Sequence, residues 1–583
     1  MNTGHTATMI NKEMPAQPAL ISEKKIELST GSLFILLLLA NSTFASGINE
    51  DAIKAGKKIY IEGKLASGED VIATTVSDVQ LTGEQAACVN CHRHSGLGSN
   101  EGSTIASAIT GKILFSERKI KAHRYFSKEK QQSSSQDRPA YTASSLKNTL
   151  LTGVTNNGNQ LDILMPKYTL GENDYNHLYA YLNSLSIVSP GVTDTTLHIA
   201  TIVDERVSTT KSNTMLRTLE EYISALNSGT RNEKARAEQA PIQKEWQYQG
   251  YRKFKLHVWT LTGTPDTWQE QLNKYYDEHP VFAVVSGISK DSWEKVDTFC
   301  NTREVPCILP NILTPGFSDK NFYTLYFNAG PNNDANVIAR YFHTKSTDSE
   351  KTNNIVQLYD AASYSLIASN TLQEEITSNG KHSITSVSLD EISDNPSINQ
   401  YIKNENTNVV IWSEKLDASL LAKLSSNKDK IKSIFIPYYL ATSAEERKKL
   451  NNIGIEVLTA YPYVKPSKEM RATIRSSIWA RSRKIDTTEK VVFTNTFTAV
   501  NLLIDAIKHV RSYFSRPYII EILEHMIDRA VLTGMYPKLT IGPSQRYASR
   551  GGYIMKVTDD TSAPLQPISE WLLPEKQVKL IRR

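Results

Sequence analysis

The sequence predicts a multidomain fold in which a small all-α domain precedes two α/β lobes. Its 583 residues are enough for about three or four domains of ordinary size. A Cys-X-X-Cys-His motif lies between helical patterns near the start, and from about residue 195 strand-like apolar runs alternate with helical patterns. A hydrophobic fraction of 40% and a charged fraction of 22% are ordinary for globular chains and exclude disorder along the whole chain.

Charge and cysteine content exclude two further classes of protein. The formal net charge is only +5, and no dense Lys/Arg stripe with interleaved aromatic residues is present, so nucleic acid is not an expected partner. Four cysteines in a chain of this length exclude a scaffold held together mainly by disulfides.

The first 45 residues have the pattern of a secretory signal peptide. Lys24 and Lys25 precede a short apolar run at 33–40, and small residues follow up to Ala45, after which we place the cleavage. The run is about half as long as a membrane-spanning helix, although an uncleaved anchor is the alternative. We therefore expect a soluble, exported protein in the periplasm, where disulfides can form. Contact with a membrane is expected only through an uncleaved leader.

The first two cysteines form the motif Cys88-Val-Asn-Cys91-His92, which has the spacing of c-type haem attachment. Two thiols three positions apart can form thioethers with one porphyrin edge, and the adjacent imidazole can bind the iron. A zinc half-site and a redox dithiol are the alternatives. The first lacks a second Cys/His pair at finger spacing, and the second lacks a preceding βαβ-type strand.

A second axial ligand is expected downstream of His92, and Met165 is the strongest candidate. Pro166 restricts the backbone of the residue before it to an extended conformation, which suits a loop that holds a thioether against a haem face. The rival ligands are His94, His123 and His177.

Residues 47–188 resemble a class I c-type cytochrome. The resemblance rests on the haem motif, the Met-Pro loop, a first helix near 51–62 with Gly56 and Tyr60, and a last helix with Tyr181 and Leu182. A basic insertion at about 116–140 departs from the family pattern. The resemblance implies one covalently bound haem c and a redox partner protein, such as a periplasmic dehydrogenase or a respiratory complex.

Residues 195–583 are expected to form two α/β lobes with parallel sheets. The first lobe is placed at about 195–330 plus a returning segment, with strands at 197–203, 254–261, 281–286 and 305–309 and helices at 215–226, 268–276 and 293–300. The second is placed at about 350–510, with strands at 355–359, 409–412, 433–437 and 455–459 and helices at 363–376 and 500–510.

Two such lobes in an exported chain resemble the type I periplasmic binding proteins of ABC transporters. The segment 323–330, before a helix, resembles a crossing between lobes, and 536–553 resembles the late β-elements of that family. The resemblance implies a small-molecule ligand bound between the lobes at the strand ends. The residues expected to line that cleft are Ser286, Gly287, Asn311, Asp360, Tyr364, Trp412 and Ser413.

The other two cysteines, Cys300 and Cys307, lie at a predicted helix end and the start of the next strand. A disulfide between them is the prediction, and two separate buried thiols are the alternative.

The sequence carries no catalytic motif for a hydrolase, a metalloprotease or a P-loop enzyme, and we name no catalytic residue. We expect a mono-haem electron-transfer protein whose two-lobed part binds a small molecule or docks a redox partner. The alternative is a solute-binding or sensing protein of an ABC-transporter-like system, with the haem as redox reporter. A third hypothesis is an enzyme that oxidises the ligand through the haem.

Overall fold

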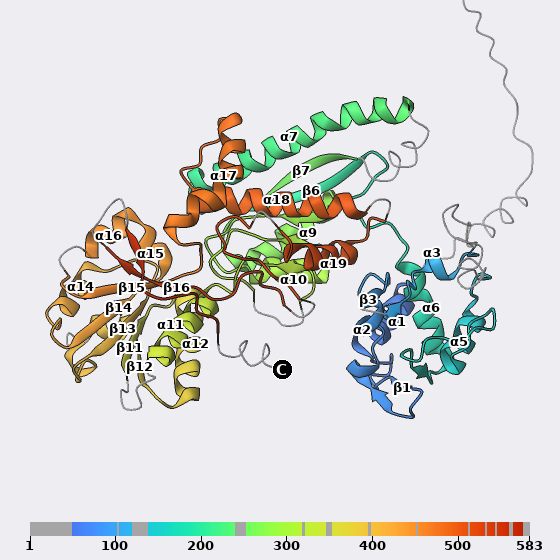
Figure 1. Cartoon of the computed structure of the whole chain (residues 1–583), viewed down its shortest axis with the longest axis horizontal. Coiled ribbons are helices and arrows are strands. Elements are labelled where there is room, and N and C mark those ends of the chain that lie inside the picture. The colour runs from blue at the N-terminus through green and yellow to red at the C-terminus, as the bar shows by residue number, and fades with distance from the viewer. Residues whose placement is uncertain are drawn as a thin grey trace, which may run out of the picture. The chain divides into compact units, whose positions relative to one another are not determined.

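A computed structural model describes residues 49–101, 104–118, 138–239, 252–316, 321–345, 353–394, 398–450, 453–510, 513–530, 533–542, 545–558 and 564–574. The predicted leader, most of the basic insertion and the rival ligand His123 lie outside these residues. Figure 1 shows the chain coloured from blue at the N-terminus to red at the C-terminus.

The N-terminal region, residues 49–188, is mainly helical. Its helices are α1 (Glu50–Glu62), α2 (Val89–His92), α3 (Gly111–Leu114), α5 (Ala143–Thr152) and α6 (Glu172–Ser184). Gly56 of α1 packs directly on α6, because a Cβ atom there would lie 2.0 Å from the carbonyl oxygen of His177. The rings of Tyr60 and Tyr181 pack beside this crossing in a tilted arrangement, with centroids 5.2 Å apart and an interplanar angle of 55°. Both predicted terminal helices are thus present.

The sequence analysis expected this region to be all-α, but the structure shows that it also contains short strands. Strands β2 (Gln80–Thr82), β1 (Ile72–Thr74) and β5 (Lys167–Tyr168) form a small antiparallel sheet in that order, and β3 (Ser99–Glu101) pairs with β4 (Thr104–Ala106). Strands of two or three residues are too short to give a periodic signal in the sequence.

Lobe 1 is built on a parallel sheet. Within the described residues the strand order is β10 (Thr324–Leu325), β9 (Cys307–Ile308), β8 (Ala283–Val285), β6 (Thr196–Asp204) and β7 (Lys253–Leu261). Alternate side chains point to opposite faces of β6, so Ile202 packs toward α9 (Trp268–Glu278) and α10 (Glu294–Thr302), and Ile199 packs toward α7 (Thr209–Gln239). Helices on both faces explain why the inner strands β8 and β9 are apolar and fully buried, whereas the edge strand β7 alternates with exposed polar residues.

Lobe 2 is built on a larger sheet. Its order in the described residues is β12 (Ser383–Ser388), β11 (Asn354–Tyr359), β13 (Thr407–Trp412), β14 (Ile431–Phe435), β15 (Glu456–Tyr461), β16 (Tyr553–Val557) and β17 (Leu565–Pro567). The last two strands are antiparallel to their neighbours. Helices α11 (Pro331–Lys345) and α12 (Ser363–Asn379) pack on one face, and α14 (Ala418–Ser425) and α16 (Ala444–Leu450) pack on the other. The remaining short helices are α13 (Leu389–Asp394) and α15 (Tyr438–Thr442).

The chain crosses between the lobes at three places. It passes to lobe 2 between β10 and α11, returns after β15 toward α17 (Pro466–Ser482) and α18 (Lys490–Val510), and passes to lobe 2 again after α19 (Arg516–Ile527) to form β16. The predicted helix 500–510 was placed in the second lobe, but α18 packs on α7 and β8 of lobe 1. Figure 1 shows this orange helix alongside α7 and β6. Helix α18 therefore belongs to the segment that returns to lobe 1. The prediction was wrong because chain order does not reveal on which lobe a buried helix packs.

One helix among the described residues, α18, is long and apolar enough to cross a membrane. Most of its apolar window is buried inside the protein, which is typical of a core helix.

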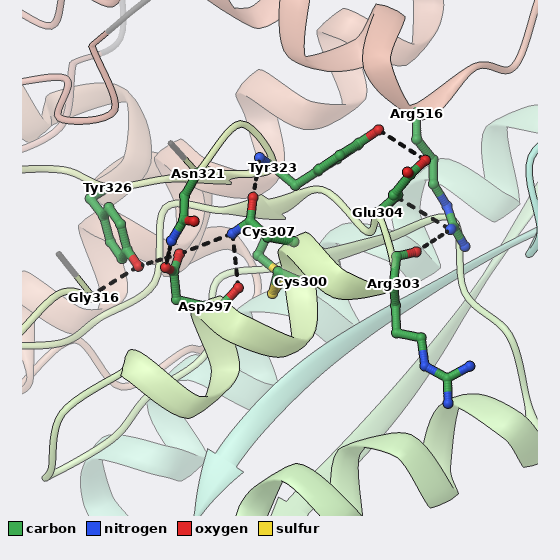
Figure 2. Close-up of a disulfide and its surroundings, with 11 residues drawn as sticks. Asp297, Cys300, Arg303, Glu304, Cys307, Gly316, Asn321, Tyr323, Tyr326 and Arg516 are labelled. Carbon is green, nitrogen blue, oxygen red and sulfur yellow. Dashed lines mark hydrogen bonds between the residues drawn. A yellow bond between two sulfur atoms is a disulfide. The ribbon is translucent and has the colours of Figure 1, made fainter. Parts of the chain in front are cut away.

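Figure 2 shows the disulfide that joins Cys300 on α10 to Cys307 on β9, which confirms the predicted pairing. Arg516 lies beside it, only 4% exposed, and donates hydrogen bonds to the carbonyl oxygens of Arg303 (3.1 Å) and Glu304 (3.3 Å). The same guanidinium donates to the carbonyl of Pro190, where the N-terminal region ends. These bonds hold α19 against the loop between the two cysteines.

Candidate functional site

The Cys-X-X-Cys-His motif occupies α2 and the residue before it. Cys88 is the residue preceding α2 and is buried, whereas Cys91 is exposed, and both carry free thiols. The imidazole Nδ1 of His92 lies 2.8 Å from the carbonyl oxygen of Ser107. A His that donates from Nδ1 to a carbonyl keeps Nε2 free as a metal ligand, with the ring orientation fixed.

The loop that carries Met165 is fastened to the segment before the motif. Tyr168, two residues after Pro166, pairs through β5 with β1 and donates from its hydroxyl to the carbonyl of Ala86, at 2.9 Å. Cys88 belongs to the apolar cluster of the N-terminal region, and the half-buried Met165 packs against that cluster. The motif and the methionine loop therefore meet at one core, as a haem held from two sides requires.

The structure gives little support to the two alternatives for the motif, a redox dithiol and a zinc half-site. Burial raises the pKa of the Cys88 thiol to about 12, whereas a redox-active dithiol needs a lowered pKa. Within the described residues, no group of three or more His, Cys, Asp or Glu side chains is arranged to hold a metal ion, so the zinc interpretation finds no further ligands.

Two rival axial ligands can be located. His94 is stacked on Phe322 with ring centroids 3.7 Å apart, and desolvation lowers its pKa to about 3. His177 lies on α6, where its backbone carbonyl contacts Gly56. The assignment of Met165 stays a prediction.

The loop after the motif also contacts lobe 1. The backbone N–H and the hydroxyl of Ser95 donate to the two carboxylate oxygens of Glu521 on α19, at 2.8 and 2.6 Å. Burial raises the pKa of Glu521 to about 7. A cavity of about 970 Å³ opens beside this contact and is lined by Arg93, His509 and His525 among others. It lies away from the strand ends at which the sequence analysis placed the ligand.

The lobe 1 candidates come together as a hydrogen-bonded group. Ser286 and Gly287 follow β8 with φ of 57° and 113°, and a Cβ atom on Gly287 would lie 2.8 Å from the Trp293 ring. Asn311 donates from Nδ2 to the hydroxyls of Ser286 and Thr496, at 3.0 Å each, while its buried Oδ1 has no hydrogen-bond partner. Thr496 of α18 was missed, although several polar residues interrupt an otherwise apolar helix at 494–498.

The lobe 2 candidates hold lobe 2 together. Asp360 accepts from the backbone N–H groups of Ala362 (3.1 Å) and Glu414 (3.0 Å), and the Ser413 hydroxyl donates to the carbonyl of Lys415. Tyr364 donates to the buried carboxylate of Asp334. Trp412 is 1% exposed and donates to Gln357, so it packs within the core. A role of these four side chains in binding a ligand stays a prediction.

A group of aromatic side chains joins the three crossings. We call it the crossing cluster: Phe327 from the first crossing, Tyr463 from the second, Tyr536 from the third, and Tyr438 from the start of α15. Ring centroids of Phe327 and Tyr536 are 5.1 Å apart, those of Tyr463 and Tyr536 5.1 Å, and those of Tyr438 and Tyr463 5.5 Å. The sequence analysis missed this cluster, although its three tyrosines each adjoin a proline.

The fold has counterparts among solved structures. One is a branched-chain amino acid ABC transporter protein from Thermus thermophilus with bound valine, at 11% identity and a TM-score of 0.47, covering 67% of this chain and 100% of the other. Another is a solute-binding protein from Rhodopseudomonas palustris in complex with 3,4-dihydroxybenzoic acid, at 11% identity and a TM-score of 0.44, covering 66% and 99%.

A third is a substrate-binding periplasmic protein from Ralstonia solanacearum, at 10% identity and a TM-score of 0.45, covering 64% and 99%. Similarity at this level assigns no ligand to this chain. No protein-family model and no curated protein matches the chain.

Proposed function

We propose that the protein is an exported, periplasmic solute-binding or sensing protein of the ABC-transporter type that carries one covalently attached haem c. The single observation that supports the binding function is the threefold crossing between two α/β lobes. The first two crossings leave from the carboxyl ends of β10 and β15, where ligands of open α/β sheets bind.

In this proposal the crossing cluster and the hydrogen-bonded group of Ser286, Asn311 and Thr496 take part in ligand binding. Aromatic rings give apolar contact area, and the tyrosine hydroxyls and the free Asn311 Oδ1 can hydrogen-bond a polar end. A small molecule with an apolar body and one polar end, such as an amino acid or an aromatic acid, suits these groups.

The experiment for the binding function is a thermal-shift screen of the full chain. Valine, leucine and 3,4-dihydroxybenzoic acid are the first probes, since small molecules of these two classes suit rings with hydroxyls. We expect one class to raise the Tm with increasing concentration, because a ligand that binds only the folded state stabilises it. An Asn311→Ala variant should lose that increase. A Tm that no amino acid or aromatic acid changes would refute the binding function.

For the haem, Cys88 and Cys91 would form the thioethers, His92 would bind the iron through Nε2, and Met165 would supply the second protein ligand to the iron. Bound there, the haem supplies one-electron transfer between Fe(II) and Fe(III). The Ser107 carbonyl would keep the His92 ring in position, and Tyr168 would hold the methionine loop close to the motif. This chemistry also supports the second candidate function, electron transfer to a redox partner protein.

Optical spectra of the purified protein test the haem. We expect a c-type α band in the reduced-minus-oxidised difference spectrum, which disappears in Cys88→Ala/Cys91→Ala. Met165→Ala should keep the covalent haem but change the spectrum and lower the reduction potential, since loss of a thioether ligand destabilises Fe(II). Wild-type protein without any haem band would contradict the proposal, and an unchanged Met165→Ala spectrum would contradict the axial assignment alone.

A further inference from the structure

Helix α17 carries three large apolar side chains on its exposed side. Met470 is 80% exposed, Ile474 51% and Ile478 59%. Their spacing of four residues places them in one stripe along the helix, which we call the α17 ridge. The residues that α17 buries are the small or polar Thr473, Ser476 and Ala480. A surface helix of a globular protein normally has the opposite arrangement.

The fold does not need the ridge for its own stability. Trp479 anchors α17, with its ring 5.8 Å from that of Tyr222 on α7 and 5.0 Å from that of Phe497 on α18. Figure 1 shows α17 next to α7 and α18. Three neighbouring apolar side chains left in water are typical of a surface that another body covers.

The charges on α17 itself are almost all positive. The basic residues on α17 or directly after it are Lys468, Arg471, Arg475, Arg481, Arg483 and Lys484. Glu469 is the acidic residue of the helix, and it is already paired with Lys490. Arg471 and Arg475 are exposed, and each directly follows a ridge residue, so both flank the ridge; Arg475 also lines the cavity of about 970 Å³. A second copy of this chain would therefore bring cations against cations, which is unfavourable.

We propose that the α17 ridge binds the surface of an anionic lipid bilayer. A helix that exposes apolar residues flanked by Lys and Arg lies in the interface plane, with the apolar side chains among the acyl chains and the cations at the lipid headgroups. A bilayer deforms around a convex ridge, whereas an acidic protein would have to offer a matching groove. This proposal does not depend on the haem or on the ligand.

Co-sedimentation of the full chain with lipid vesicles tests the proposal. We expect binding to vesicles of phosphatidylcholine and phosphatidylglycerol in equal parts, and little binding to phosphatidylcholine alone. The variant Met470→Ser/Ile474→Ser/Ile478→Ser should bind more than about a hundredfold more weakly, because three apolar side chains each contribute more than about 1 kcal/mol on burial. Its Tm should stay that of the wild type, since these side chains are exposed in the folded chain.

The matched control is Val76→Ser/Val79→Ser/Leu366→Ser, which removes three exposed apolar side chains from other elements and should bind as the wild type does. Neutralising Arg471 and Arg475 to Gln should weaken binding by about fivefold for each residue, at a contribution of about 1 kcal/mol per cation. Wild-type protein that pellets with neither vesicle, or serine-variant protein that pellets like the wild type, overturns the proposal. The first of these results would instead favour an acidic protein, with a groove that matches the ridge, as the binding partner.

Discussion

Two buried ionisable side chains show how single residues support the crossings. Arg516 is surrounded by oxygen atoms from four segments, among them the Val281 carbonyl at 2.6 Å and the Tyr276 hydroxyl at 2.9 Å. Asp334, at the start of α11, accepts from the Tyr364 hydroxyl. Desolvation raises the pKa of Asp334 to about 7, so this carboxyl group holds its proton in the folded state well above the pH at which it ionises in the unfolded chain.

Asp334 should make the stability of the protein depend on pH. Its folded pKa is the higher one, so its stabilising effect is complete below about pH 4 and is lost as the pH rises toward about 7. We expect the free energy of unfolding to fall in this window by up to about 1.4 kcal/mol per pH unit from this group. Asp334→Asn should flatten that slope in urea unfolding measured from pH 4 to 8.

The control for this measurement is Tyr364→Phe, which removes the donor but keeps the carboxyl group and should therefore keep the slope. A slope that is the same in Asp334→Asn and in the wild type would contradict the pKa assignment.

At the scale of elements, the crossing of α1 and α6 fixes the N-terminal region. A Cβ atom on Gly56 would lie 2.0 Å from the His177 carbonyl oxygen and 2.8 Å from the Tyr181 Cβ, and neither neighbour is a flexible side-chain end. The two helices can approach this closely only because residue 56 has no side chain. The same contact supports the ring pair of Tyr60 and Tyr181 beside Cys88.

Gly56→Ala should therefore destabilise the N-terminal region by about 1–3 kcal/mol, because an added methyl group forces α1 and α6 apart. Thermal unfolding followed by circular dichroism measures the effect. The matched control is Gly229→Ala in α7, where a Cβ atom would have nothing within 4 Å. That change should leave stability the same or raise it slightly, since alanine favours the helix. Equal effects of the two substitutions would contradict the close crossing.

At the scale of the whole molecule, the crossings make lobe 2 a composite of distant segments. Asn333 donates from Nδ2 to the carbonyl of Gly551 at 3.1 Å and accepts from the N–H of Gly551 at 2.8 Å, so residues 218 apart in the sequence are joined directly. Strand β16 then enters the sheet antiparallel to β15. These links connect the first crossing to the third.

The sequence by itself determined the longer buried strands and several helices of the two lobes, and the pairing of two cysteines. Strands such as β6 and β11 were predicted within a few residues, since a strand buried on both faces is a continuous apolar run bounded by polar residues. The predicted disulfide follows from a seven-residue separation between a helix end and a strand start. The Cys-X-X-Cys-His motif could be recognised because the haem attachment that we propose needs residues close together in the sequence.

Only the tertiary structure decided which distant segments meet. It placed α18 in lobe 1, Trp412 in a core and Thr496 beside Asn311, and it brought the rings of three crossings together. It also showed that the apolar stripe of α17 faces outward, although the four-residue spacing of Met470, Ile474 and Ile478 is typical of a buried stripe. The physical reason is that the periodicity of apolar residues indicates whether a segment forms a helix or a strand. The packing partners of that segment depend on contacts between residues hundreds of positions apart.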